Sequence, residues 1–123
     1  MAKYSTYFID IDGTIFEYRK FETYESSQPV VTPGTLDKLQ EIHTAGHTIV
    51  LTTARPEYLR GHTVRELEET GIPYDRLIME IERGPRHLIN DMDPKTPGDR
   101  AISWNLTRDT GLGTVQVDQV SDQ

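Results

Sequence analysis

Apolar positions along the chain fall into short runs that predict an alternation of strands and helices. Residues 4–11 are rich in β-forming side chains and end at Asp-Gly-Thr, a combination typical of a strand followed by a turn. Residues 48–53 form a second apolar run that suits a buried parallel strand. Further short strands are expected at residues 76–79, at 87–89, and at either 104–106 or 114–117.

Helical patterns separate these strands. Residues 33–45 carry apolar side chains at helical spacing, and Gly46 follows them where a helix cap favours a positive φ. Residues 56–70 predict a second helix, which begins with a proline and is ended by Gly71. A third, short helix is expected over residues 98–103. This order of elements predicts a mainly parallel sheet covered on both faces, with ligands at the carboxyl ends of its strands.

Length and composition fit one domain with a hydrated surface. The chain has 123 residues, 35% hydrophobic and 27% charged, so we expect one domain over residues 1–123 with a flexible tail at about 118–123. It contains no cysteine, which excludes disulfides and thiolate metal sites. No signal-peptide pattern and no membrane-spanning apolar run is found, so a cytoplasmic location is expected. The net charge of −7 disfavours general nucleic-acid binding.

Two acidic residues at the end of the first predicted strand are the main candidates for chemistry. Asp10 and Asp12 are two positions apart, so both side chains leave the strand on the same face. Their charges repel, and a divalent cation with oxygen ligands, best matched by magnesium, would relieve the repulsion. Gly13 permits a tight turn and lets backbone N–H groups approach an anion. An ordinary polar turn is the alternative, but burying a strand that ends in two unused acids is costly.

The segment YFIDIDGTI, residues 7–15, resembles the first signature of the haloacid dehalogenase superfamily. The resemblance implies a Rossmann-like, three-layer α/β/α fold, and it covers residues from about 5 to 107. It also implies that Asp10 attacks phosphorus and forms an aspartyl-phosphate. Asp12 would then protonate the leaving oxygen and later activate water, and Mg²⁺ would be held by Asp10 and the backbone carbonyl of Asp12.

Two later signatures of this superfamily are matched in the same order along the chain. Thr53, at the end of the second strand, matches the residue whose hydroxyl binds phosphate, with Ala54 beside it. A simple strand end made of β-forming residues is the alternative. Asp91, after the segment HLIN, resembles the third metal ligand, and an Asn-Asp turn is the alternative.

The lysine that steadies the nucleophile in this superfamily has no match at its usual place. Arg83 is the best substitute, Arg86 is second, and Lys95, beyond the third metal ligand, is a further candidate. Arginine keeps the positive charge and binds phosphate in a forked geometry, although it is bulkier than lysine. A solvated loop is the alternative for these arginines.

Neither place at which the superfamily inserts a cap domain has room for one. Residues 14–32 are expected to form only a flap, in which Phe16 and Tyr18 are candidate substrate contacts. Packing of the flap onto the body is the alternative that we favour. Arg55 is a further candidate contact that equally suits pairing with a glutamate. An open site suits a phosphorylated macromolecule, or a small phosphorylated substrate enclosed by another subunit of a homo-oligomer.

These features predict a magnesium-dependent phosphomonoester hydrolase that acts on a sugar phosphate or a nucleotide. The missing lysine leaves a second hypothesis open, which is a metal- and phosphate-binding module that has lost turnover and regulates a partner. A receiver-type phospho-acceptor domain is disfavoured, because receivers carry their acceptor aspartate on the third strand.

Overall fold

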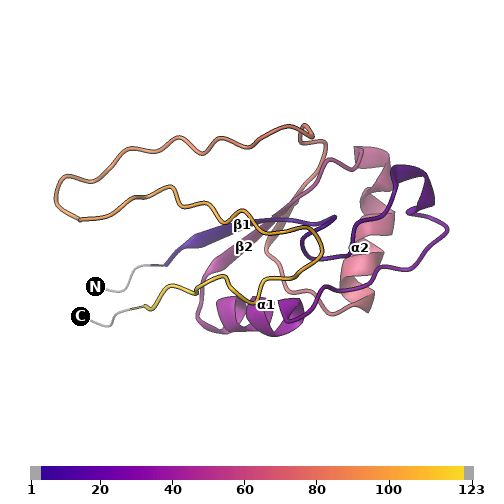
Figure 1. Cartoon of the computed structure of the whole chain (residues 1–123), viewed down its shortest axis with the longest axis horizontal. Coiled ribbons are helices and arrows are strands. Elements are labelled where there is room, and N and C mark those ends of the chain that lie inside the picture. The colour runs from indigo at the N-terminus through magenta and orange to yellow at the C-terminus, as the bar shows by residue number, and fades with distance from the viewer. Residues whose placement is uncertain (1–3, 121–123) are drawn as a thin grey trace.

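The computed structural model describes residues 4–120 and contains a small parallel sheet with two α-helices (Figure 1). In chain order the elements are β1 (Thr6–Asp10), the 3₁₀ helix η1 (Phe21–Thr23), α1 (Thr35–Thr44), β2 (Thr48–Thr52), the 3₁₀ helix η2 (Glu57–Leu59), α2 (Arg60–Glu69) and β3 (Arg76–Ile78). Strand β2 lies between β1 and β3. The predicted parallel α/β fold is confirmed, and no cap domain is evident within the described residues.

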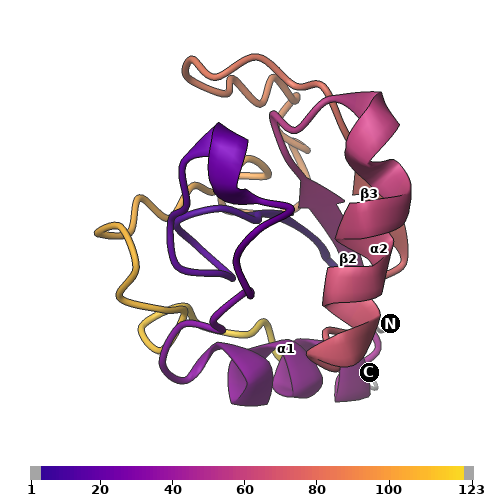
Figure 2. The ribbon, with the colours of Figure 1, turned by 90° about the vertical axis from the view of Figure 1, so that its right-hand side faces the viewer.

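One face of the sheet carries the core. Ile9 lies opposite Leu51, and Leu51 lies opposite Leu77, so apolar side chains form a row across the three strands. The helix residues that pack in the same core are Leu39, Ile42 and Leu67. Full burial of each such side chain contributes about 1.5–3 kcal/mol. Both helices therefore cover this one face, α1 below and α2 beside the sheet in Figure 2.

The helices form where the sequence predicts them. Gly34 precedes α1 with a φ of 70°, and Gly46 follows it with a φ of 92°, the left-handed region that glycine adopts without strain. The Gly46 N–H donates to the His43 carbonyl at 3.0 Å and closes the last turn. The second predicted helix begins as η2 and continues as α2.

The opposite face of the sheet is only partly covered. Phe8 is 53% exposed and Ile78 is 44% exposed, although Val50 between them is buried. A long excursion, residues 82–105, leaves β3 and returns to the body without forming a helix or strand (Figure 1, orange). A second helical layer on this face is therefore not seen among residues 4–120.

The excursion corrects two predictions. The strand expected at residues 87–89 is absent, because these residues pair with no strand and Ile89 is 91% exposed. The helix expected at residues 98–103 is also absent. So short a helix is stable only when it packs on other elements, and Ile102 is 56% exposed.

The last predicted strand, at residues 104–106 or 114–117, does not form either. Backbone groups of the C-terminal segment bond to side chains instead of a neighbouring strand. The Leu112 N–H donates to Thr35 Oγ1 at 3.2 Å, and the Val115 carbonyl accepts from the Lys38 ammonium. The segment thus fills the core beside α1 as irregular chain.

Asp118 fastens the end of this segment to β1. Its N–H donates to the Tyr7 hydroxyl at 2.8 Å, and its carbonyl bonds to the His47 ring at 2.9 Å. The tail expected to be flexible therefore begins at a held residue, and its residues 121–123 lie outside the described residues. No helix among residues 4–120 is long and apolar enough to cross a membrane.

Gly111 marks the closest approach of the C-terminal segment to the start of α1. Its φ is +87°, and a Cβ there would lie 1.9 Å from the Pro33 carbonyl oxygen. Gly71 also has a positive φ, +75°, but a Cβ there meets nothing within 4 Å.

We expect Gly71→Ala to cost about 1–2 kcal/mol of unfolding free energy from backbone strain alone. Gly111→Ala should cost clearly more, because the segment must also move.

Urea unfolding of both variants measures the difference. Equal losses of stability would show that the approach of the C-terminal segment to Pro33 does not contribute to the fold.

Candidate active site

The carboxyl ends of β1 and β2 bring the first predicted site residues together. Asp10, the last residue of β1, lies opposite Thr52, the last residue of β2. Thr53 and Ala54 directly follow Thr52 in the chain. The Thr53 N–H donates to the Ile78 carbonyl of β3 at 3.0 Å, which extends the pairing by one step. Thr53 is 1% exposed, and its hydroxyl oxygen accepts the Arg55 N–H at 3.1 Å.

Gly13 makes the turn that the sequence predicts. Its φ is +88°, its N–H donates to the Phe16 carbonyl at 2.8 Å, and its carbonyl accepts the Asp109 N–H at 2.8 Å. The Gly13 N–H is therefore already bonded inside the turn. Gly13 shapes the turn and does not present its own N–H to an anion.

Asp10 is the accessible acid of the pair. Its side chain is 43% exposed, Thr14 Oγ1 donates to it at 3.4 Å, and an Arg86 guanidinium nitrogen lies 3.8 Å from Oδ1. Partial burial raises the pKa of Asp10; the Arg86 charge opposes the rise, and the Asp12 charge adds to it. A carboxylate in this setting is exposed enough to react and has a cation close by.

Asp12 is bound by a buried arginine. Arg55 Nε and Nη2 donate to the two Asp12 carboxylate oxygens at 2.9 and 2.8 Å, a forked pair that fixes the carboxylate in two directions. The Arg55 side chain is 1% exposed and the Asp12 side chain 12% exposed. Asp10 and Asp12 thus lie in different environments: Arg55 holds the Asp12 carboxylate, and the Asp10 carboxylate is open to solvent.

Arg55 also binds helix α2 and the flap. Its Nη1 donates to Glu66 Oε1 at 2.9 Å and to Thr63 Oγ1 at 3.1 Å, and its guanidinium lies 4.2 Å from the centre of the Tyr24 ring. All three side-chain nitrogens of Arg55 thus donate within the protein, and the pairing with a glutamate that the sequence offered as the alternative is present.

Glu66 also pairs with a second arginine. Arg19 of the flap donates to both of its oxygens at 2.9 and 2.8 Å, and the His62 ring lies 3.2 Å away. Burial by itself would raise the pKa of Glu66, but Arg19 and Arg55 outweigh it and lower that pKa. We call Asp12, Arg55, Glu66 and Arg19 the Arg55 network.

Burial and the neighbouring Asp12 charge raise the pKa of Tyr24 to about 12, while Arg55 and Arg83 act in the opposite direction. For Arg55, burial disfavours the charge, but the hydrogen bonds and charges of Asp12 and Glu66 prevail and its pKa is raised. The guanidinium therefore stays charged, and the Tyr24 phenol stays neutral, over the ordinary pH range.

The candidates to replace the missing lysine lie at different distances from Asp10. Arg86 approaches Asp10 directly, at 3.8 Å. Arg83 lines a pocket with Ala54 on the same side of the molecule, and its charge acts on Tyr24. Lys95 lies exposed in the excursion. Arg86 is thus the cation that the structure brings to Asp10.

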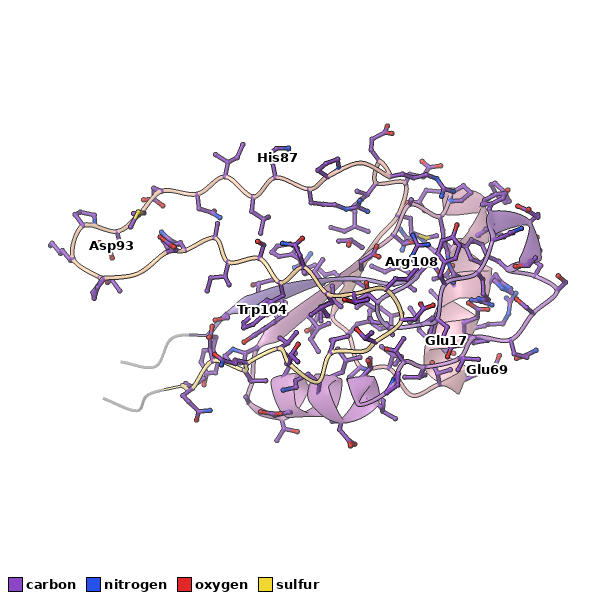
Figure 3. The ribbon with its side chains drawn as sticks, viewed as in Figure 1. Glu17, Glu69, His87, Asp93, Trp104 and Arg108 are labelled. Atoms are coloured by element: carbon purple, nitrogen blue, oxygen red, sulfur yellow. The ribbon has the colours of Figure 1, made fainter. Side chains whose placement is uncertain are left out.

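Asp91 is not brought to this cluster. It lies in the excursion, is 77% exposed and pairs with Arg100 at 3.0 Å. Figure 3 shows Asp93, two residues farther on, at the far end of the excursion, and Arg108 back at the body. Asp91 was expected to meet Asp10 and Asp12 because a strand at residues 87–89 would carry it to the same edge of the sheet, and that strand does not form. Among residues 4–120, no three acidic, histidine or cysteine side chains form a group suited to a metal ion.

The two flap aromatics have different positions. Phe16 is fully buried in the core, so it is not a substrate contact, and the packing alternative is correct for it. Tyr18 is 42% exposed, and the Arg108 guanidinium lies 4.1 Å from its ring centre. Tyr18 remains a candidate contact beside the turn at Gly13.

A protein-family model that describes haloacid dehalogenase-like hydrolases matches residues 7–75, more than half of the chain. The chain belongs to the haloacid dehalogenase-like hydrolase family. A crystal structure of a target protein from Vibrio cholerae has a similar fold, with a TM-score of 0.50 and 18% sequence identity over 71% of this chain and 79% of that chain. At this identity the likeness shows the fold alone. No curated protein matches the chain in sequence.

The match to the haloacid dehalogenase-like hydrolases covers only part of the predicted site. It includes Asp10, Asp12 and Thr53, together with the buried Arg55, and it ends before the three later candidates, Arg83, Arg86 and Asp91. The residues outside the match are those on or beside the excursion. The family match therefore spans the part of the chain that carries the first candidates and does not reach the later ones.

Sequence reasoning missed several residues that shape the site of this hydrolase. Arg108 lies 3.4 Å from where a Cβ of Gly13 would be, and the Asp109 carboxylate accepts the Tyr18 N–H at 2.7 Å. The Asp-Thr-Gly sequence at 109–111 is a turn signal that marks this loop. No local signal identifies Glu66 or Arg19, because each is one charged residue in a polar segment.

Removing the Arg55 charge should destabilise the hydrolase strongly. Arg55→Met leaves the buried Asp12 carboxylate without its cation, and breaking a buried ion pair from one side costs about 3–5 kcal/mol. Arg100→Met is the matched control, because it removes an exposed pair worth less than about 1 kcal/mol. Urea unfolding measures both, and equal small losses would contradict the structural role of Arg55.

Asp10→Asn should stabilise the fold at neutral pH. The pKa of Asp10 is higher in the folded chain than in the unfolded chain, so its ionisation opposes folding and stability falls as the pH rises through its pKa. Asparagine cannot ionise. We expect a higher Tm for Asp10→Asn at about pH 7 and no difference at about pH 3. The exposed Asp37→Asn is the control, and a gain that is equal at both pH values would contradict this account.

Proposed function

We propose that this haloacid dehalogenase-like hydrolase cleaves phosphomonoesters through a phosphorylated Asp10. The observation that carries the proposal is the difference between the two acids: Asp10 is open beside Arg86, whereas Asp12 is held by Arg55. An open carboxylate suits nucleophilic attack, and a fixed one suits proton transfer at a set position.

The proposed reaction has two displacements at phosphorus. In the first, an Asp10 oxygen bonds to phosphorus, the ester P–O bond breaks, and the leaving oxygen takes a proton. In the second, water attacks the same phosphorus, the bond to Asp10 breaks, and inorganic phosphate leaves. Asp12 lies two residues from the nucleophile and is proposed to carry the proton in both steps.

The Arg55 pair affects these steps unequally. Its two hydrogen bonds hold the Asp12 carboxylate in one place, which suits a group that takes a proton from a water at a set position. Arg86 and the Thr53 hydroxyl are proposed to stabilise the charge on the transferred phosphoryl oxygens. An arginine near the nucleophile thereby takes over the part of the lysine that the sequence lacks.

Magnesium belongs to the proposal through the family, but the residues as arranged do not fit a complete site. The Asp10 carboxylate and the Asp12 carbonyl lie at the strand ends, whereas the Asp12 carboxylate is paired with Arg55 and Asp91 is paired with Arg100. The steps above are therefore written for the side chains of the chain alone. Magnesium dependence, and a part for Asp91 in it, are questions for the activity measurement.

The phosphate-binding regulatory module stays the second candidate. The observation that favours it is the Arg55–Asp12 pair, in which both Asp12 carboxylate oxygens already accept hydrogen bonds from Arg55. Such a module would bind phosphate at the same strand ends without releasing product.

An aryl phosphate assay separates these functions. With Mg²⁺ present, Asp10→Asn should lose activity by at least about a thousandfold, because no phosphoenzyme can form. The exposed Asp37→Asn should keep it. Chelation with EDTA, followed by readdition of Mg²⁺, measures whether the activity depends on a divalent cation. Mass spectrometry should find a phosphoryl group on the wild-type peptide that contains Asp10.

Equal rates for wild type and Asp10→Asn would contradict the nucleophile. If neither protein hydrolyses the ester but both still bind inorganic phosphate, the regulatory module is the better reading.

A further inference from the structure

The excursion and the outer face of the sheet both present apolar side chains to solvent. On the sheet these are Phe8 and Ile78, which lie on the face that neither α-helix covers. On the excursion, five large apolar side chains are between 44% and 91% exposed: Leu88, Ile89, Met92, Ile102 and Trp104. A single exposed apolar residue is ordinary, but a set of them along one segment marks a surface that binds another surface.

Strand β1 offers a free backbone edge beside the same face. Among residues 4–120, β1 pairs with β2 alone, so its other edge has no strand neighbour. The side chains of residues 87–89 favour a strand, but these residues pair with no strand in the structure. Strand addition between two chains combines these two features, an open sheet edge and an extended apolar segment.

The excursion extends beyond its own sheet. Its far end lies past the amino end of β1, and Figure 3 shows Asp93 there, away from both helices. The Thr96 N–H donates to the Asp93 carbonyl at 3.2 Å and closes a turn, and Asp91 pairs with Arg100 across the two limbs at 3.0 Å. The far end is thus a built turn whose apolar neighbours have no surface of their own chain beneath them.

The distribution of charge favours contact between an excursion and the body of another copy. The excursion carries four acidic and four basic side chains and is neutral, so the net charge of −7 lies entirely on the rest of the chain. Two acidic bodies repel each other, whereas a neutral segment approaches an acidic body without this penalty.

The excursion is also long enough for a stable interface. It has about two dozen residues, and specific interfaces use roughly 20–30 residues a side. Because each copy has one excursion and one open sheet face, a reciprocal contact is satisfied by two copies and leaves neither surface over.

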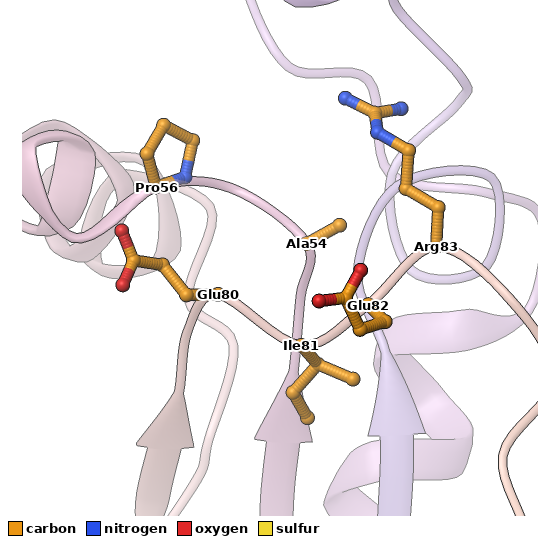
Figure 4. Close-up of a pocket in the computed structure, with 6 residues that line it drawn as sticks. All are labelled: Ala54, Pro56, Glu80, Ile81, Glu82 and Arg83. Carbon is orange, nitrogen blue, oxygen red and sulfur yellow. The ribbon is translucent and has the colours of Figure 1, made fainter.

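The pocket at the carboxyl end of the sheet suits the excursion less well. This pocket, of about 340 Å³, lies between the turns after β2 and β3 (Figure 4). Three of its six lining residues are charged, and the lining consists of Ala54, Pro56, Glu80, Ile81, Glu82 and Arg83. An apolar side chain placed there would remove water from these charges without pairing them, which is unfavourable.

We propose that the excursion of one copy packs on the outer sheet face of a second copy, beside the free edge of β1, and that the exchange is reciprocal. The protein is then a two-fold dimer in which Ile89 of each chain is covered by the other. This inference concerns assembly and does not depend on the proposed hydrolysis.

Light scattering coupled to size exclusion, over a range of protein concentrations, tests the dimer. The wild type should have the mass of two chains at high concentration. Ile89→Asp should raise the dissociation constant at least about tenfold, because it places a charge in the apolar contact. Val30→Asp is the matched control, since Val30 is 50% exposed on the flap and lies outside the proposed interface. It should leave the dissociation constant unchanged.

Disulfide trapping identifies the surfaces in contact. The chain has no cysteine, so introduced thiols are the only ones present. Phe8→Cys and Ile89→Cys are purified separately and mixed under oxidising conditions, so that a mixed disulfide forms only between chains. Replacing Phe8→Cys by Val30→Cys should trap far less mixed dimer.

A wild type that stays a single chain at every concentration, or a dimer that Ile89→Asp leaves intact, would overturn the interface. Equal trapping by Phe8→Cys and Val30→Cys would do the same. A disulfide within one chain of the diluted Phe8→Cys/Ile89→Cys double variant would show that the excursion covers its own sheet, which also overturns the exchange. Each of these results leaves the test of the Asp10 nucleophile unaffected.

Discussion

The pairing of the buried Arg55 with Asp12 and Glu66 is the constraint on which the rest of the site depends. A guanidinium at this depth must meet opposite charges, because leaving it unpaired in a poorly solvated interior costs several kcal/mol. Its net contribution to stability is small by comparison, since removing both charges from water is itself unfavourable. The network therefore matters mainly for geometry. It joins the end of β1, the turn after β2, helix α2 and, through Arg19, the flap.

This geometry separates two acids that the sequence makes look alike. Asp12 faces inward to the network, and Asp10 faces outward to Arg86 and solvent. The same turn after β2 that places Arg55 also places Ala54 and Pro56 at the pocket. The internal charge pairing and part of the pocket lining thus come from one short loop. A capless hydrolase has few other elements with which to define a substrate site.

Local patterns in the sequence were enough for the first two-thirds of the fold. The helices around Leu39 and Leu67 and the strand that ends at Asp10 follow from apolar spacing and glycine positions, all of them short-range signals. The prediction failed after β3, where the strand expected at residues 87–89 needed a neighbour that the excursion does not reach.

Prediction of the site was limited in the same way, because short-range patterns do not show which distant residues come into contact. Asp10, Thr53 and Gly13 could be found because strand ends in a parallel sheet share one edge. The partner of Arg55 could not be identified as Glu66, because that choice depends on how α2 packs. Arg108 stands far along the chain from the Gly13 turn that it covers, and the turn signal at residues 109–111 predicts a loop there without indicating which part of the chain that loop contacts.

The contact between Tyr7 and Asp118 spans 111 positions of the chain. Contacts of such long sequence separation form late, because the loop must close before the bond is gained. During synthesis β1 can pair with β2 as soon as both have emerged, but the Tyr7 hydroxyl meets its partner only after residue 118 has been made. β1 therefore gains its last side-chain contacts only after the C-terminal segment has emerged, long after its pairing with β2 can form.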